Sequence, residues 1–399
     1  MKSTVAAIDF GTSKIVTLIA EHSNVTRCDI VGAGIAAYDG FLADGWNNPG
    51  ELNDRILDSI KDAENQCRHK VHAINVGVPG AFTKVYATEA HVSLKGTNPS
   101  VSGTDIKAIF KAAEENLQLE NSMGVIVHSS PAWFMVDSGK KTLEPVGLKG
   151  HELTALVSFV VADKFFVDEV NTRLTSLGFQ VEGFYSTLAG ESMLFLPEDD
   201  RDHTSVLIDM GYLCTDVMAA EGDALMYVGS IDMGGGNIAA DLAMGLDISL
   251  RDAEEKIKRQ YVYSIDVPGE TFELPPTDGQ KARSFTREEV TAIITPRVDE
   301  IAEAIQKLLE DSGIRLGNWS NIYLTGGGLS FNRGGKDYLA TKLGRPVRDT
   351  PKRTATLNSH AYSSALGLLD LIITTMDQSQ DNSGSTGVVK GFFRSLFGI

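Results

Sequence analysis

The stretch IDFGTSK (residues 8–14) has a counterpart, IDMGYLC (residues 208–214), in the second half of the chain. An apolar run precedes each Asp, and the runs at residues 15–20 and 216–220 follow each Gly-containing turn. The order of apolar strand, Asp, Gly turn and apolar strand predicts a β-hairpin at both places. Strand-Asp-Gly turns are common, so one such pair could arise by chance.

A second pair of similar segments follows in the same order. INVGVPG (residues 74–80) and IYLTGGG (residues 322–328) each read as a short strand that enters a Gly-rich turn. Amphipathic helical stretches, residues 51–67 and 297–309, precede them. Two pairs in one order favour a duplication, and we expect two similar α/β halves that face each other across a cleft.

Composition limits the function classes. With 399 residues, 42% of them hydrophobic and 22% charged, the chain has ordinary globular composition and room for two to four domains. Its net charge of −17 argues against binding to the phosphate backbone of nucleic acids. Three scattered cysteines without a CxxC pair predict neither a disulfide framework nor a zinc site, and fit a reducing cytoplasm.

The two Asp-Gly turns predict a site for a phosphate ligand. Successive N–H groups in a tight turn can hold an anion, and Gly permits close approach of the backbone. We therefore assign nucleotide-binding roles to Gly11, Thr12, Ser13 and Lys14, and to Gly211 and Tyr212. The paired carboxylates of Asp9 and Asp209 are expected to hold the waters of a bound Mg²⁺, as candidate catalytic and metal-positioning groups. Alternatively, each Asp only accepts hydrogen bonds from its own turn.

Further residues are expected around the rest of the nucleotide. Gly326, Gly327 and Gly328 leave space in which a purine and its ribose can lie against the backbone. GGGN (residues 234–237) opens a helical stretch, so free N–H groups of Gly235, Gly236 and Asn237 would suit the sugar-phosphate end. Glu254 and Lys258, spaced i, i+4, share a helix face and are assigned to the ribose and the base, or else form a solvated ion pair.

The last residues differ from everything before them. Residues 374–386 have the composition of a flexible linker. At about 100° per residue, residues 387–399 separate into an apolar and a basic face. This pattern predicts a helix that lies on an anionic membrane surface; docking into a partner's groove or onto the core is the alternative. The membrane-binding residues would be Val388, Val389, Lys390, Phe392, Phe393, Arg394, Leu396, Phe397 and Ile399.

These motifs together resemble those of the actin/Hsp70/sugar-kinase superfamily. The two Asp-Gly turns resemble its phosphate motifs, TGGG (residues 325–328) its adenosine motif, and residues 359–367 its connecting helix. Within it the chain resembles the FtsA family of bacterial cell-division proteins. That narrower resemblance rests on PVGLKG (residues 145–150), GNI with DLA (residues 236–243) and DAE (residues 252–254). The phosphate-2 turn departs from the pattern at Tyr212, Leu213 and Cys214, which puts hydrolysis in doubt more than binding.

The resemblance implies the fold class: α/β, an actin-like duplication of two ribonuclease-H-like halves around a nucleotide cleft, with an FtsA-type insertion and a C-terminal amphipathic helix. Its subdomains would be 1A (residues 1–80, 163–186 and 358–373), 1C (81–162), 2A (187–241 and 299–357) and 2B (242–298), followed by the linker (374–386) and the membrane helix (387–399).

The resemblance also implies ATP and Mg²⁺ in the cleft, with slow or conditional hydrolysis. It implies head-to-tail filaments, later division proteins bound through subdomain 1C, and the C-terminal peptide of FtsZ bound to subdomain 2B, where we assign Arg283 and Arg287. The function would be to tether the FtsZ ring to the cytoplasmic face of the cell membrane at the division septum, without nucleic acid. A carbohydrate kinase or a chaperone-like ATPase of the same superfamily are the alternatives.

Overall fold

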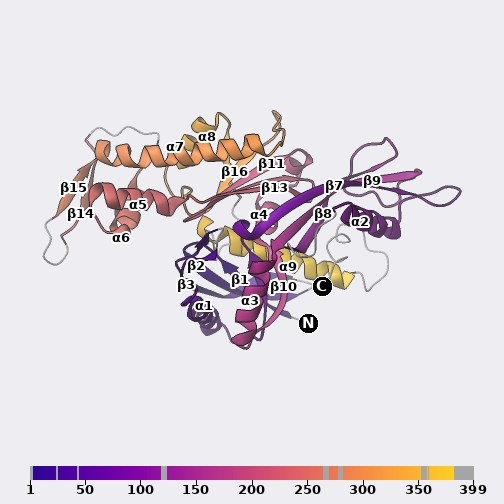
Figure 1. Ribbon diagram of the computed structural model, residues 1–399, viewed down its shortest axis with the longest axis horizontal. Coiled ribbons are helices and arrows are strands. Elements are labelled where there is room, and N and C mark those ends of the chain that lie inside the picture. The colour runs from indigo at the N-terminus through magenta and orange to yellow at the C-terminus, as the bar shows by residue number, and fades with distance from the viewer. Residues whose placement is uncertain are drawn as a thin grey trace.

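A computed structural model describes residues 3–23, 26–42, 45–117, 124–263, 269–276, 282–351, 357 and 359–381. Figure 1 shows an elongated molecule with two sheet-containing halves in its middle. Smaller units project from the halves to either side, one carrying β7, β8, β9 and α2, and the other carrying β14, β15 and α6.

The first half is built on a five-stranded sheet of order β10-β6-β1-β2-β3, in which β1 is antiparallel to β2 and parallel to β6. Helix α1 covers one face because its apolar positions recur at helical spacing. Gly34 of β3 allows close approach: a Cβ there would lie 1.8 Å from the Ser59 carbonyl oxygen. The elements are β1 (Ser3–Phe10), β2 (Lys14–Ser23), β3 (Thr26–Ala37), β4 (Phe41–Leu42), β5 (Gly45–Trp46), α1 (Leu52–Gln66), β6 (Ala73–Val78), α3 (Lys164–Ser176), β10 (Gln180–Ser186) and α9 (Ser363–Asp381).

The second half repeats this sheet. Its order is β13-β12-β11-β16-β17, with β11 antiparallel to β12 and parallel to β16. Each predicted hairpin thus lies beside the predicted Gly-turn strand of its own half, which confirms the duplicated α/β fold. The elements are α4 (Thr187–Phe195), β11 (Ser205–Met210), β12 (Thr215–Glu221), β13 (Ala224–Ile231), α5 (Gly235–Leu246), α7 (Arg287–Asp311), β16 (Ile322–Thr325), α8 (Gly335–Leu343) and β17 (Val347–Asp349).

Two smaller units interrupt the halves. In the first, a three-stranded sheet of order β7-β9-β8 packs on α2 around a core of its own. In the second, the hairpin of β14 and β15 packs with α5 and α7 into the core of the second half. The subdomain boundaries given above remain predictions. The elements are β7 (Thr83–Ser93), α2 (Gly103–Leu117), β8 (Gly124–Val136), β9 (Glu152–Asp163), α6 (Leu250–Asp252), β14 (Thr271–Leu274) and β15 (Arg283–Thr286).

Two expectations need correction. The helix expected to carry Glu254 and Lys258 on one face is divided into α6, a π-helical turn (Ala253–Ile257) and a 3₁₀ turn (Lys258–Gln260). The π turn places an extra residue in the helical cycle, and Lys258 directly after it is buried. In addition, α9 continues to Asp381, so the first part of the expected linker is helical. The remainder of the linker and the expected membrane helix, residues 387–399, lie outside the described residues.

Helices α4 and α9 cross where the two halves meet. Gly190 and Gly367 allow the contact: a Cβ on Gly190 would lie 2.3 Å from the Gly367 carbonyl oxygen. Leu188 and Leu371 share a core there with Leu207 of β11. The crossing therefore holds the residues just after Gly190 in place, next to the ends of β1 and β11.

Candidate functional site

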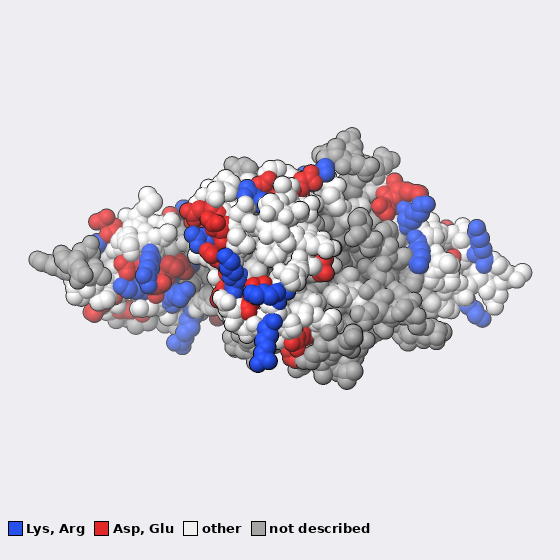
Figure 2. Space-filling view, turned by 90° about the horizontal axis from the view of Figure 1, so that it is seen from below, with Lys and Arg blue, Asp and Glu red and all other residues white. Residues whose placement is uncertain are grey.

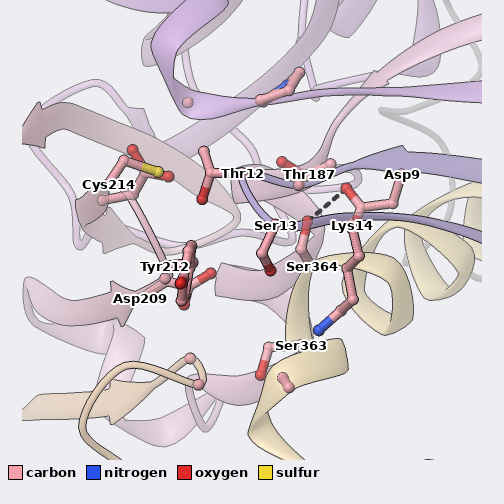
Figure 3. A pocket seen from close by; sticks show the side chains of 18 of the residues that line it. Asp9, Thr12, Ser13, Lys14, Thr187, Asp209, Tyr212, Cys214, Ser363 and Ser364 are labelled. Atoms are coloured by element: carbon pink, nitrogen blue, oxygen red, sulfur yellow. Dashed lines mark hydrogen bonds between the residues drawn. The ribbon is translucent and has the colours of Figure 1, made fainter. Parts of the chain in front are cut away.

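A cavity of about 280 Å³ opens between the two halves. Its walls come from both hairpins, from the Gly-rich turn after β16, and from α4 and α9. Figure 3 shows Asp9, Thr12 and Lys14 of the first half converging with Asp209 and Cys214 of the second half. The structure therefore brings together the two motifs that the sequence pairs.

The first hairpin contributes an acid and a base to the cavity. Asp9 is the penultimate residue of β1, and its Oδ1 accepts a hydrogen bond of 2.8 Å from Ser364 Oγ of α9. Gly11 N–H donates to the Lys14 carbonyl at 2.9 Å, which closes the turn. The ammonium group of Lys14 lies 4.9 Å from the centre of the Tyr362 ring. Burial lowers the pKa of Lys14, and the carboxylates of Asp9 and Asp209 oppose that shift.

The second hairpin repeats this geometry. Gly211 N–H donates to the Cys214 carbonyl at 2.9 Å, the same bond that closes the first turn. The two turns also contact each other, because Leu213 N–H donates to Thr12 Oγ1 at 3.0 Å. The N–H group of Leu213, in the second Asp-Gly turn, thus points across the cleft and is bound by a hydroxyl group of the other half.

Besides Glu254, four carboxyl groups line the cleft: those of Asp9, Glu191, Asp209 and Asp216. Burial raises the pKa of Asp9 to about 6 and, together with Asp216 and Asp9, that of Asp209 to about 7. Burial also raises the pKa of Asp216 to about 6, against a hydrogen bond from Ser230. Asp209 Oδ1 has no hydrogen-bond partner in the described part of the chain. These groups are short of positive charge, and a cation suits them.

The described residues include no group of three or more His, Cys, Asp or Glu side chains arranged to hold a bare metal ion. Mg²⁺ bound with a nucleotide keeps several of its waters and takes few direct protein ligands. Carboxyl groups that line a cavity without forming a cluster of direct ligands suit such a hydrated ion. The residues present therefore fit Mg²⁺ held through water.

The glycines after β16 have different roles. Gly326 has φ +86°, and a Cβ on it would lie 2.1 Å from Asp209 Oδ1, so the backbone requires glycine there. Gly328 N–H donates to the Met210 carbonyl at 2.7 Å, which ties the turn to the second hairpin. Gly327 lines the cavity, and its nearest neighbours are Phe331 and Ala361. Only Gly326 and Gly327 of this predicted set face the cavity.

The prediction of free N–H groups at residues 235–237 is wrong. Gly235 and Gly236 N–H donate to the carbonyls of Gly211 and Tyr212, at 2.9 and 2.7 Å, and Asn237 N–H donates to Gly234. Helix α5 therefore begins against the second hairpin, and its first turn is already satisfied. Glycine is needed there for packing, since a Cβ on Gly235 would lie 2.5 Å from Gly328 Cα.

Glu254 and Lys258 form an ion pair, with 2.9 Å between Lys258 Nζ and Glu254 Oε2. The side chain of Lys258 is 3% exposed, so the expected solvated pair is instead mostly buried. Glu254 lines the cavity, and Arg259 does so from the same segment, whereas Lys258 lies behind the wall near Gly235. The pair places an acid at the rim of the site and gives it a fixed position.

Several cavity residues were not predicted from the sequence. Ser363 and Ser364 come from the first turn of α9, Thr187 and Glu191 from α4, and Phe331 from the loop after the Gly-rich turn. Ser364 lay within the recognised segment 359–367 but carried no signal of its own. Glu191 sits in an otherwise apolar and small stretch, TLAGESMLF, where a lone acid is the one available signal.

The two arginines assigned to peptide binding differ. Arg283 lies at the surface of the hairpin, and its guanidinium donates to the carbonyls of Leu246 and Asp247. Arg287 is buried against Glu270 and donates to the Val262 carbonyl at 2.7 Å. Arg287 is therefore placed to hold the hairpin together and not to contact a partner. In Figure 2 acidic and basic side chains alternate at this end of the molecule, on the left of the view.

None of the described helices is both long and apolar enough to cross a lipid bilayer. The residues assigned to membrane binding, residues 388–399, lie outside the described part of the chain.

Comparison with solved structures agrees with the fold. The chain is similar to the PilM-PilN type IV pilus biogenesis complex (TM-score 0.60, 17% identity, covering 92% of this chain and 98% of that one). It is also similar to MreB 5 of Spiroplasma citri bound to AMPPNP (TM-score 0.55, 11% identity, covering 96% and 99%). At these identities the likeness establishes the actin-like fold alone.

Comparison of sequences is more specific. A family model described as "Cell division protein FtsA" matches residues 206–367. The cell division protein FtsA of Neisseria meningitidis is 26% identical over 373 residues, which cover 92% of this chain and 89% of the relative. That of Pseudomonas aeruginosa is 24% identical, covering 92% and 88%. With the duplicated fold and the paired hairpins, these matches support the identification of the chain as a relative of the FtsA cell division proteins.

Proposed function

We propose that the chain binds ATP with Mg²⁺ in the cleft and tethers the FtsZ ring to the cytoplasmic face of the cell membrane at the division septum. The observation that carries the nucleotide part is the meeting of the two hairpins at one cavity, joined by the hydrogen bond from Leu213 N–H to Thr12 Oγ1. The N–H groups of Gly11, Gly211 and Leu213 are engaged in bonds within and between the turns. The other N–H groups of the two turns, with Lys14, would donate to the phosphates. A solved relative in fold, MreB 5 of Spiroplasma citri, was bound to AMPPNP, which supports the same ligand class here.

Different cavity residues would contact different parts of the ligand. The turns at residues 11–14 and 211–213 would hold the phosphates, with Lys14 as the cation nearest to them. Gly327, Phe331 and Glu254 would surround the base and the ribose. Asp9 and Asp209 would hold the waters of Mg²⁺, which supplies positive charge to the phosphates. What the chain itself does is to bind, orient and join the two halves around one ligand.

The nucleotide would act mainly as a structural ligand. Binding that engages both halves favours one relative position of them, and this shift in population needs no fast turnover. Cys214 occupies the cavity where a hydroxyl is usual in this motif, and burial raises the pKa of its thiol well above the ordinary value. The thiol is thus neutral and a weak hydrogen-bond donor, so we expect hydrolysis to be slow.

The tether function joins three properties. Similarity to the FtsA cell division proteins supports a place in the division machinery, with FtsZ and a second copy of the chain as partners. We assign the FtsZ C-terminal peptide to the unit of α6, β14 and β15, later division proteins to the unit of β7–β9 and α2, and anionic lipid to residues 387–399. Filaments would align many weak lipid anchors and convert them into strong attachment.

Calorimetric titration of ATP into the full chain, with and without Mg²⁺, tests the nucleotide part. We expect one ATP per chain and tighter binding with Mg²⁺. Absence of binding would contradict the proposal. Turnover of ~1–100 s⁻¹ with a sugar as acceptor would point to a kinase instead.

A further inference from the structure

Tyr212 is the one aromatic residue in the two Asp-Gly turns. It follows Gly211 in the second turn, where Thr12 follows Gly11 in the first. Thr12 is buried, and its hydroxyl group accepts the bond from Leu213 N–H, so its side chain is used between the turns. Tyr212 is half-buried and lines the cavity (Figure 3), so its larger side chain is available to a ligand.

The ring of Tyr212 lies against the first turn of α5. A Cβ on Gly236 would lie 2.7 Å from Cε1 and 2.8 Å from Cζ of the ring, so the ring fits only over glycine. Gly236 N–H in turn donates to the Tyr212 carbonyl at 2.7 Å. The ring therefore covers part of the helix start that the sequence assigns to the sugar-phosphate end of the ligand, and its position is held from both sides.

The hydroxyl group of Tyr212 is free to bind a ligand. It has no hydrogen-bond partner within the described part of the chain, and it is not closed off from solvent. Burial, and then the charge of Glu254, raise the pKa of Tyr212 above its ordinary value. The phenol is therefore neutral, so its O–H can donate a hydrogen bond and its oxygen can accept one.

Glu254 determines which part of a nucleotide suits this corner of the cavity. A Cβ on Gly235 would lie 2.7 Å from Lys258 Nζ, and Lys258 is paired with Glu254. Tyr212 and the ion pair thus lie against the consecutive residues Gly236 and Gly235, and both Tyr212 and Glu254 line the cavity. A carboxylate repels phosphate and accepts hydrogen bonds from hydroxyl groups. The part of the ligand that suits this corner is therefore the ribose.

We propose that Tyr212 contacts the ribose of the bound nucleotide and selects for its hydroxyl groups. The ring packs against the sugar, and the phenol hydroxyl group forms a hydrogen bond with one of the 2′ and 3′ hydroxyl groups, while Glu254 accepts a bond from the other. This inference rests on the proposed binding of ATP in the cleft. A deoxyribonucleotide leaves one of these protein groups without a partner, which costs affinity.

The test is calorimetric titration of the full chain and of Tyr212→Phe with ATP, 2′-deoxy-ATP and 3′-deoxy-ATP, in Mg²⁺. Phenylalanine keeps the ring and removes the hydroxyl group. We expect Tyr212→Phe to bind ATP roughly 3–10-fold more weakly, the effect of one lost hydrogen bond, and to bind one of the two deoxy analogues as the unmodified chain does. Tyr86→Phe, in β7 and outside the cavity, is the matched control and should leave all three affinities unchanged.

The outcomes separate this inference from the proposed function. If the unmodified chain binds no ATP, the proposed function fails, and this inference fails with it. If the unmodified chain binds ATP and Tyr212→Phe binds ATP equally well, only the role of Tyr212 is wrong. An equal loss for ATP and for both deoxy analogues would show that Tyr212 only shapes the turn, and would also overturn the inference. We expect Gly236→Ala to weaken the preference for ATP as well, because its methyl group would displace the ring.

Discussion

Asp9 and Asp209 occupy the same place in the two hairpins, yet their surroundings differ. Asp9 accepts a hydrogen bond from Ser364, whereas Asp209 Oδ1 has no partner among the described residues. Burial raises the pKa of both acids, to about 6 for Asp9 and to about 7 for Asp209, and the carboxylates of Asp216 and Asp9 add to the rise at Asp209. The contact with α9 on one side and the crowding of carboxyl groups on the other make the two equivalent acids unequal.

These shifts predict how stability depends on pH. A carboxyl group whose folded-state pKa is raised binds more protons in the folded chain, so its contribution to stability is present at low pH and is lost as pH rises through the folded-state value. The stabilising contribution of Asp9 is thus lost as the pH rises through its folded-state pKa of about 6, and that of Asp209 as the pH rises through its folded-state pKa of about 7. We therefore expect the Tm of Asp209→Asn to fall less than the Tm of the unmodified chain as the pH rises from about 5 to about 8, in EDTA and without nucleotide. Parallel Tm curves for the two proteins would contradict the raised value.

A large side chain at position 327 would block the cleft with the least effect on the fold. A side chain there meets Phe331 at 3.3 Å and Ala361 at 3.4 Å, and its backbone needs no left-handed conformation. Gly327→Trp should therefore fill the cavity without unfolding the chain and lower ATP affinity at least tenfold, or about 1.4 kcal/mol. Calorimetry measures the loss. Gly50→Trp, at an exposed turn away from the cavity, is the control, and equal affinity in both variants would place the nucleotide elsewhere.

Gly326 should respond differently, through stability. Its φ of +86° is unfavourable for a side chain, and a Cβ would collide with Asp209 Oδ1. The conformation alone costs roughly 1–2 kcal/mol for any L residue. Gly326→Ala should accordingly lower the free energy of unfolding, measured in denaturant, by more than that amount. Unchanged stability would mean that the turn after β16 is formed differently.

At the scale of elements, the sequence predicted what periodic patterns encode. The strands of both hairpins, the helix α1 and the strand-to-glycine turns follow from alternating or helical spacing of apolar residues. Of α7 only residues 297–309 were predicted, and the helix begins ten residues earlier, at Arg287. The sequence did not predict which acceptors bind the N–H groups at the start of α5, because this depends on how closely α5 packs on the second hairpin. A row of glycines looks the same in a sequence whether the space is for a ligand or for another backbone.

The burial of Arg287 could not be predicted for the same kind of reason. Its basic neighbours suggested a peptide-binding surface, but the pairing of β14 with β15 turns it inward against Glu270. The position of Glu191 likewise depends on the crossing of α4 and α9, which no local pattern records. Sequence alone thus located both Asp-Gly turns and did not predict that Glu191 lies in the same cavity.

The two arginines give a prediction for the hairpin of β14 and β15 and the start of α7. Arg287→Glu should destabilise the chain by roughly 3–5 kcal/mol, because it breaks a buried ion pair and leaves Glu270 unpaired. Arg283→Glu removes the hydrogen bonds to the carbonyls of Leu246 and Asp247 and should cost less, about 1–2 kcal/mol. Denaturant unfolding separates them. Because Arg283 is exposed, Arg283→Glu also tests peptide binding. Full affinity of this variant for an FtsZ C-terminal peptide would mean that the peptide binds elsewhere.

At the scale of the whole molecule, the order of the strands is the strongest result. Both sheets have the same arrangement, and the hairpins that the sequence pairs meet at the cavity between them. Nucleotide in this cavity would contact both halves at once, so it can influence any surface whose shape depends on their relative position. The proposed filament and the proposed membrane attachment are such whole-molecule properties.

The most direct measurement of the tether is co-sedimentation of FtsZ with anionic liposomes in the presence of the full chain and Mg²⁺-ATP. The account predicts that FtsZ pellets with lipid only when the full chain is present, and that truncation after Ser385 or the double change Phe392→Glu with Phe393→Glu abolishes this. FtsZ that pellets equally well with the truncated chain would contradict the proposed tether.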